Sequence, residues 1–168
     1  MKITKTFFRY FAYSLEILIF YILQSTPKLL PELFGSKPLI LIAVALTIAA
    51  KETEIPSLIF GAVCGVLTDI ATGGSIGYFA IILTLVCYFE SHIFKTYFVS
   101  TLLSVLVISA LSIPVIICLY FLFFTILAGI PDWTVLFVNH YISRIIYTFA
   151  TVILFYFVNG FLHKNLHD

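Results

Sequence analysis

Three ionisable residues, Glu16, Asp69 and Arg144, lie inside apolar stretches of the sequence. A charged side chain in the hydrocarbon core of a bilayer costs roughly 2.5 kcal/mol or more, so such residues are usually paired or functional. At about 1.5 Å per helical residue, Glu16 and Arg144 are both predicted near the midplane, where they could pair. Asp69 is expected within reach of the same arginine. The sequence therefore predicts an intramembrane charge cluster.

Three roles for this cluster are open. The acids and the base can neutralise each other and fix helix register, couple to the helix of a partner protein, or form a proton or substrate pathway. His140 lies four residues before Arg144, on the same helix face, and is expected to be a polar packing residue. Asp69 is expected to accept hydrogen bonds from the amino terminus of the next helix or to pair with Arg144.

Five glycines flank Asp69 in the sequence. Gly61 and Gly65 form a GxxxG pattern, which lets two helix backbones approach closely, either within the chain or between two chains. Gly73 and Gly74 can adopt the left-handed conformations that end a helix. Together with Gly77, they are predicted to form a helix-packing or partner interface.

Residues for other chemistry are scarce. Cys64, Cys87 and Cys118 lie in apolar runs without a CxxC pair or a histidine at ligand spacing, so we expect packing residues rather than metal ligands. The sequence has no HExxH, GxSxG or P-loop motif. We therefore predict no catalytic residue, no metal site and no cofactor, and a protein that is not an enzyme.

The elements that must position these residues follow from composition. The chain has 62% apolar and 10% charged residues, against roughly 45–50% and about 25% in soluble domains. This predicts an integral membrane protein whose surroundings are the lipid bilayer. Its 168 residues hold about six spans in one membrane domain, residues 1–168, with no room for a soluble catalytic domain. The net charge of +1 and the scattered basic residues argue against nucleic-acid binding.

An all-α bundle of six transmembrane helices is therefore expected. The predicted helices cover residues 7–23, 39–50, 55–71, 76–89, 99–130 and 134–161. The second is short for a span. The fifth is expected to be one long helix bent near Pro114, because two spans and a turn need more residues than this uncharged run provides. Glu90, His92 and Lys95 are interpreted as the polar exit of the fourth helix.

The basic residues predict the orientation. Six helices place both termini on one side of the membrane, and positively charged residues accumulate on the cytoplasmic side. The predicted cytoplasmic side has six basic residues and the opposite side has two: Lys2, Lys5, Arg9, Lys51, Lys95 and Lys164 against Lys28 and Lys37. Both termini are therefore expected in the cytoplasm.

The segment GAVCGVLTDIATGGSIGYFAIILTLVCYF, residues 61–89, resembles the central signature of the rod shape-determining protein MreD family. That signature has the form G-x-x-x-G-x-x-x-D-x-x-x-G-x-x-x-G followed by an apolar span. Gly61, Gly65, Asp69, Gly73 and Gly77 fill its positions. The LQSTP sequence after the first helix, the Lys-Pro pair before the second and the chain length are also similar to that family.

The resemblance implies a non-catalytic protein of the bacterial cytoplasmic (inner) membrane that belongs to the cell-elongation machinery. Family members act with MreC, and with MreB, RodA and a class B penicillin-binding transpeptidase, to direct lateral peptidoglycan synthesis. The resemblance thus implies a scaffold that binds MreC and helps to set cell shape.

A second function remains open. The family is distantly similar to the substrate-binding S components of energy-coupling-factor vitamin transporters, which also have six helices. An S component needs a polar pocket on its outer side, and the predicted outer connections here have few polar side chains. An unassigned membrane scaffold or enzyme is the third alternative.

Overall fold

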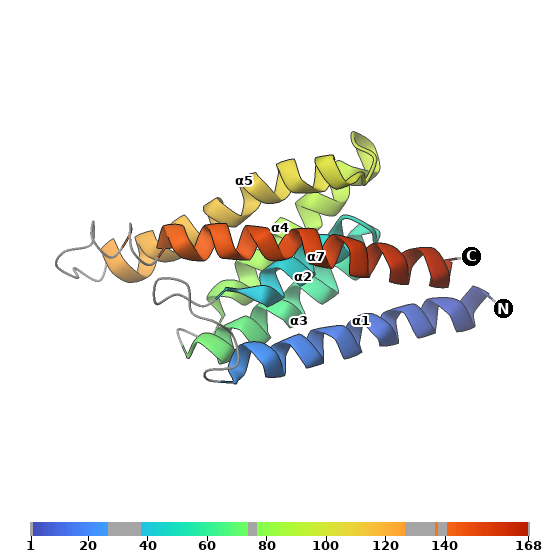
Figure 1. Ribbon diagram of the computed structural model, residues 1–168, viewed down its shortest axis with the longest axis horizontal. Coiled ribbons are helices and arrows are strands. Elements are labelled where there is room, and N and C mark those ends of the chain that lie inside the picture. The colour runs from blue at the N-terminus through green and yellow to red at the C-terminus, as the bar shows by residue number, and fades with distance from the viewer. Residues whose placement is uncertain (1, 27–37, 74–76, 127–136, 138–140, 168) are drawn as a thin grey trace.

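The computed structural model describes residues 2–26, 38–73, 77–126, 137 and 141–167. In this part of the chain the fold is all-α, which confirms the expected class. Its elements are α1 (Lys2–Ser25), α2 (Ile40–Ala49), α3 (Glu54–Thr72), α4 (Tyr78–Thr96), α5 (Leu102–Phe121), the π-helical segment η1 (Leu122–Ile126) and α7 (Ile142–His167). Figure 1 shows a bundle whose two termini lie at the same end, which we call the termini end.

Five stretches in the described residues are long and apolar enough to cross a membrane. They are Thr6–Ser25, Glu54–Thr72, Tyr78–Thr96, Leu102–Thr125 and Ile142–Lys164. Each exposes large apolar side chains on its outer face, as a helix in contact with lipid acyl chains does. Between Leu102 and Thr125 the chain forms one continuous span, so the expected single fifth helix is confirmed, with Pro114 inside it.

The second helix differs from the other helices that the structure describes. At ten residues, α2 is about 15 Å long, half the thickness of a bilayer core. All ten residues are buried, and α2 contacts α1, α3, α4, α5 and α7. Figure 1 shows it at the centre of the bundle, between α1 on one edge and α5 on the other. This helix is therefore enclosed by protein rather than by lipid.

The start of α2 is held by polar side chains from two other helices. The first N–H groups of a helix have no partner within it, and lipid supplies none. The backbone N–H of Leu39 donates to Thr148 Oγ1 of α7 at 3.1 Å, and that of Leu41 donates to Gln24 Oε1 of α1 at 3.1 Å. These two bonds satisfy donors that would otherwise be unpaired in the interior of the bundle.

The fourth helix is longer than expected. It continues to Thr96 instead of ending near residue 89, so Glu90 lies within the helix and is buried rather than at a polar exit. The third helix closely matches the prediction, from Glu54 to Thr72. The pair formed by α3 and α4 is the most extensively packed in the structure.

Candidate functional site

The α3–α4 hairpin carries the glycine pattern and Asp69, which the sequence singled out. A Cβ atom added at Gly65 would lie 2.5 Å from both the Cα of Ala80 and the carbonyl oxygen of Phe79. One added at Gly61 would lie 2.9 Å from the Cβ of Cys87. Such distances are too short for any side chain, so the GxxxG pair provides close packing of α3 against α4 within the chain.

The hairpin turn uses glycine for its backbone conformation. Gly73 follows α3 with φ of 63°, and its N–H donates to the carbonyl oxygen of Ile70 at 3.3 Å. Gly77 precedes α4 with φ of 110°. Both values lie in the left-handed region that favours glycine, and the helix stop predicted at Gly73 is confirmed. Gly74 lies outside the described residues.

Asp69 caps the helix that follows it. Its Oδ2 accepts hydrogen bonds from the N–H groups of Gly77 at 2.9 Å and Ala80 at 3.1 Å, and its Oδ1 accepts one from Phe79 at 3.0 Å. Because Gly77 occupies the N-cap position without a side chain, α4 depends on this acid from the preceding helix. The negative charge also complements the positive end of the helix dipole. Of the two arrangements expected for Asp69, the structure has the helix cap.

The expected ion pairing of the charge cluster is not found. No ion pair in the described part of the chain joins Arg144 to Glu16 or to Asp69. Arg144 is the third residue of α7 as described, whereas Glu16 lies nine residues before the end of α1. The guanidinium instead lies over the ring of Tyr141, with 5.8 Å between Cζ and the ring centroid. His140 lies outside the described residues.

A different ionic group is formed at the termini end, around Glu52 in the turn between α2 and α3. Arg9 of α1 pairs with both carboxylate oxygens, at 2.7 Å from Nε to Oε1 and 3.0 Å from Nη2 to Oε2. Tyr13 donates to the same carboxylate at 3.3 Å, and Nδ1 of His163 lies 3.4 Å from it. Ser91 of α4 donates to the Glu52 carbonyl oxygen at 2.7 Å. One buried residue thus joins α1, α4 and α7.

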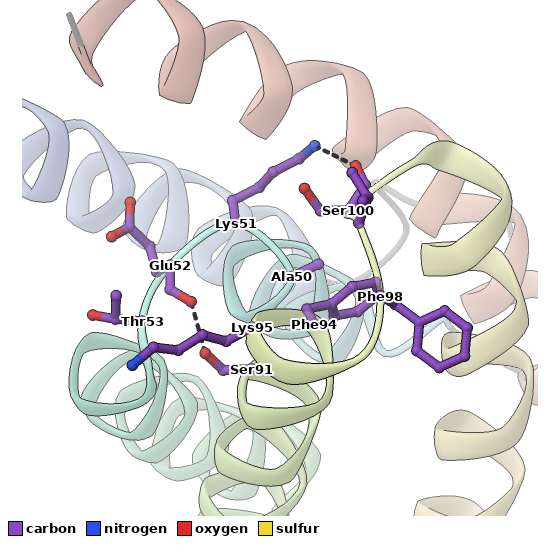
Figure 2. A pocket seen from close by; sticks show the side chains of 10 residues that line it. Ala50, Lys51, Glu52, Thr53, Ser91, Phe94, Lys95, Phe98 and Ser100 are labelled. Atoms are coloured by element: carbon purple, nitrogen blue, oxygen red, sulfur yellow. Dashed lines mark hydrogen bonds between the residues drawn. The ribbon is translucent and has the colours of Figure 1, made fainter.

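A pocket of about 410 Å³ opens beside this group, lined by the α2–α3 turn, the end of α4 and residues 98–100. Lys51 donates to the carbonyl oxygen of Ser100 at 3.1 Å and lies over the ring of Tyr156, and burial lowers the pKa of its ammonium group. Lys95 pairs with Glu54 at 2.9 Å. Figure 2 shows the two lysines pointing in different directions. They do not converge on one ligand position, and the pocket forms a polar junction between helices.

Sequence reasoning missed the residues that form these long-range contacts. It interpreted Arg9 as a topology signal and did not single out Glu52, yet they pair across 43 positions of sequence. It also placed Gln24 in a connection, although Gln24 is buried against the start of α2. The one signal in the sequence for the Arg9–Glu52 pair was that a chain with few charges has an acid and a base on the same predicted side of the membrane.

In the described ranges, no group of three or more His, Cys, Asp or Glu side chains could hold a metal ion. Cys64 and Cys87 are buried in the α3–α4 contact, as packing residues are, and Cys118 is exposed on α5.

Comparisons with protein-family models, curated proteins and solved structures find no match to this chain. The class of protein follows from the fold itself. In the part of the chain that the structure describes, five long apolar helices enclose a short buried one, which makes this a multi-pass helical membrane protein.

Proposed function

We propose that this protein is a non-catalytic scaffold of the bacterial cell-elongation machinery, located in the cytoplasmic membrane with both termini in the cytoplasm. In this role it binds MreC, works with MreB, RodA and a class B penicillin-binding transpeptidase, and helps to direct lateral peptidoglycan synthesis. The proposal rests on the resemblance of the Gly61 to Gly77 segment to the MreD family.

The observation that supports it most is the use that the fold makes of that segment. Two glycines allow close packing, Asp69 caps α4, and Gly73 and Gly77 form the turn. Each of these positions has a physical role in one rigid hairpin, which explains why the pattern requires these residue types at this spacing. A rigid hairpin inside an apolar bundle suits a protein that works by holding others in place.

Depletion of the protein in a rod-shaped host tests the proposal. The cells are expected to become round, and the wild-type protein or a Glu54→Gln variant, changed at a half-buried position, should restore the rod shape. Co-purification of MreC from the same membranes should be lost with an Asp69→Ala variant. Normal shape together with loss of vitamin uptake would instead favour an S component of an energy-coupling-factor transporter.

A further inference from the structure

Glu90 is a buried acid that the fold leaves without a partner. Its residue is 2% exposed, and neither carboxylate oxygen has a hydrogen-bond partner in the described part of the chain. It lies six residues before Thr96, the last residue of α4, and therefore about 9 Å inside the termini end of that helix. A buried polar group without a hydrogen bond is costly, so a partner from outside the chain would relieve an unfavourable state.

Glu90 lines a groove of about 220 Å³ between α4 and α5. The rest of the lining is apolar except for Ser112, and the large side chains of Phe89, Leu111 and Val115 are exposed beside it. α4 packs far less extensively against α5 than against α3, which leaves this seam open on the outer face of the bundle. The groove thus combines an apolar surface with one unsatisfied acid.

The chain does not supply a base from the other wall. No residue of α5 carries a charge, and Glu90 is the one charged residue among the described residues that line the groove. A base that pairs with Glu90 there is therefore sought in another molecule. At about 220 Å³, the groove is smaller than the roughly 300–1,000 Å³ of typical small-molecule sites. Its size suits side chains inserted from a helix that lies along the seam.

The position of Glu90 along α4 also indicates which kind of helix from another protein could bind in the groove. Single-pass membrane proteins carry lysine and arginine near their cytoplasmic helix ends, and these long side chains can extend along the helix. Glu90 lies near the end of the bundle that the basic residues predict to be cytoplasmic. We propose that the α4–α5 groove binds the transmembrane helix of another protein, and that a lysine or arginine near the end of that helix pairs with Glu90. This surface deepens the proposed scaffold function and rests on it.

The test uses the purified full-length protein in phosphatidylcholine vesicles, so it is independent of cell shape. The probe is a dye-labelled peptide helix of about 20 leucines with one lysine six residues from its end, compared with the same peptide without lysine. Energy transfer from the protein to the peptide measures binding. The lysine peptide is expected to bind roughly tenfold more tightly, and Glu90→Gln should remove most of that preference.

Two matched pairs of variants separate the groove from general effects. Glu16→Gln alters the other buried acid without a hydrogen-bond partner, on α1, and should keep the preference for lysine. Ser112→Trp fills the groove and should abolish binding, whereas Ala110→Trp, on an exposed part of α5 outside the lining, should not.

Three results would overturn the proposal. Equal binding of both peptides to the wild-type protein would show that Glu90 does not select a base. A preference that survives Glu90→Gln would place the contact elsewhere. Self-association of the protein in the same vesicles that depends on Glu90 would make a second copy the occupant of the groove. If the vesicle test succeeds while depleted cells keep their shape, only the cellular role fails.

Discussion

Asp69 and Glu90 lie in adjacent helices and are equally buried, at 2% exposed, yet their surroundings differ completely. Asp69 accepts three backbone hydrogen bonds, and the hairpin is built around it. Glu90 has no hydrogen-bond partner in the described residues and borders an open groove. Burying either carboxyl group in a membrane protein costs free energy, and only for Asp69 do hydrogen bonds within the fold offset that cost.

The difference separates two reasons for keeping an acid in an apolar bundle. A carboxylate whose oxygens are all engaged by the chain serves the structure, because its removal leaves donors unpaired. A carboxylate that the chain does not engage does not stabilise the fold and is suited to a ligand. We therefore expect the two residues to respond to substitution in opposite directions.

The largest effect is expected for Asp69→Ala. Three N–H groups at the start of α4 would lose their acceptor, each worth about 1–3 kcal/mol when buried, so the free energy of unfolding should fall by about 3 kcal/mol or more. The thermal unfolding midpoint of the detergent-solubilised protein measures this. The unfolding midpoint of Asp69→Asn, which keeps one accepting oxygen, should lie between those of Asp69→Ala and the wild type. An unchanged midpoint for the alanine variant would contradict the capping role.

Gly65→Ala is expected to be the next most damaging change. The added methyl group would meet the backbone of Ala80 at 2.5 Å, and overpacking of this kind costs about 1–3 kcal/mol. Gly160→Ala is the matched control, because a Cβ atom at that helical position meets nothing within 4 Å. It should leave stability unchanged or raise it slightly through helix propensity. Equal unfolding midpoints for the two variants would argue against close packing at Gly65.

Glu90→Leu should raise stability. Replacing a buried carboxyl that has no hydrogen bond with an apolar side chain removes an unfavourable term of about 1–2 kcal/mol. The same unfolding measurement checks this, and the variant should at the same time lose its preference for the lysine peptide. A lower unfolding midpoint would mean that the Glu90 carboxylate contributes to the fold, and the contrast with Asp69 would disappear.

The smallest effect is expected for Glu54→Gln. Its pairs with Lys95 and His92 lie at the surface of the termini end, where solvent weakens ion pairs. The unfolding midpoint of this variant should match that of the wild type within experimental error. It therefore serves as the baseline for the two buried acids, and a clear loss of stability would show that the surface pairs matter more than their exposure implies.

The sequence was most informative where the relevant signals are close together. The glycines and Asp69 act within one hairpin, so their spacing alone indicated close packing, a helix stop and a cap. The Arg9–Glu52 pair depends on how α1 meets the α2–α3 turn, which local patterns do not encode. The pairing predicted for Arg144 depended on the relative placement of α1 and α7, which local patterns do not encode. Glu90 was misread because a polar residue near a helix end is compatible with either exposure or burial.

The short central helix has a consequence for how the protein is made. At about 15 Å, α2 is too short to be held across a bilayer by its own apolarity, and the N–H groups at its start need Gln24 and Thr148. Thr148 belongs to α7, which is synthesised last among the described helices. Biogenesis therefore leaves α2 without its full set of contacts until α7 leaves the ribosome, and chains interrupted before α7 should be targets for membrane proteases.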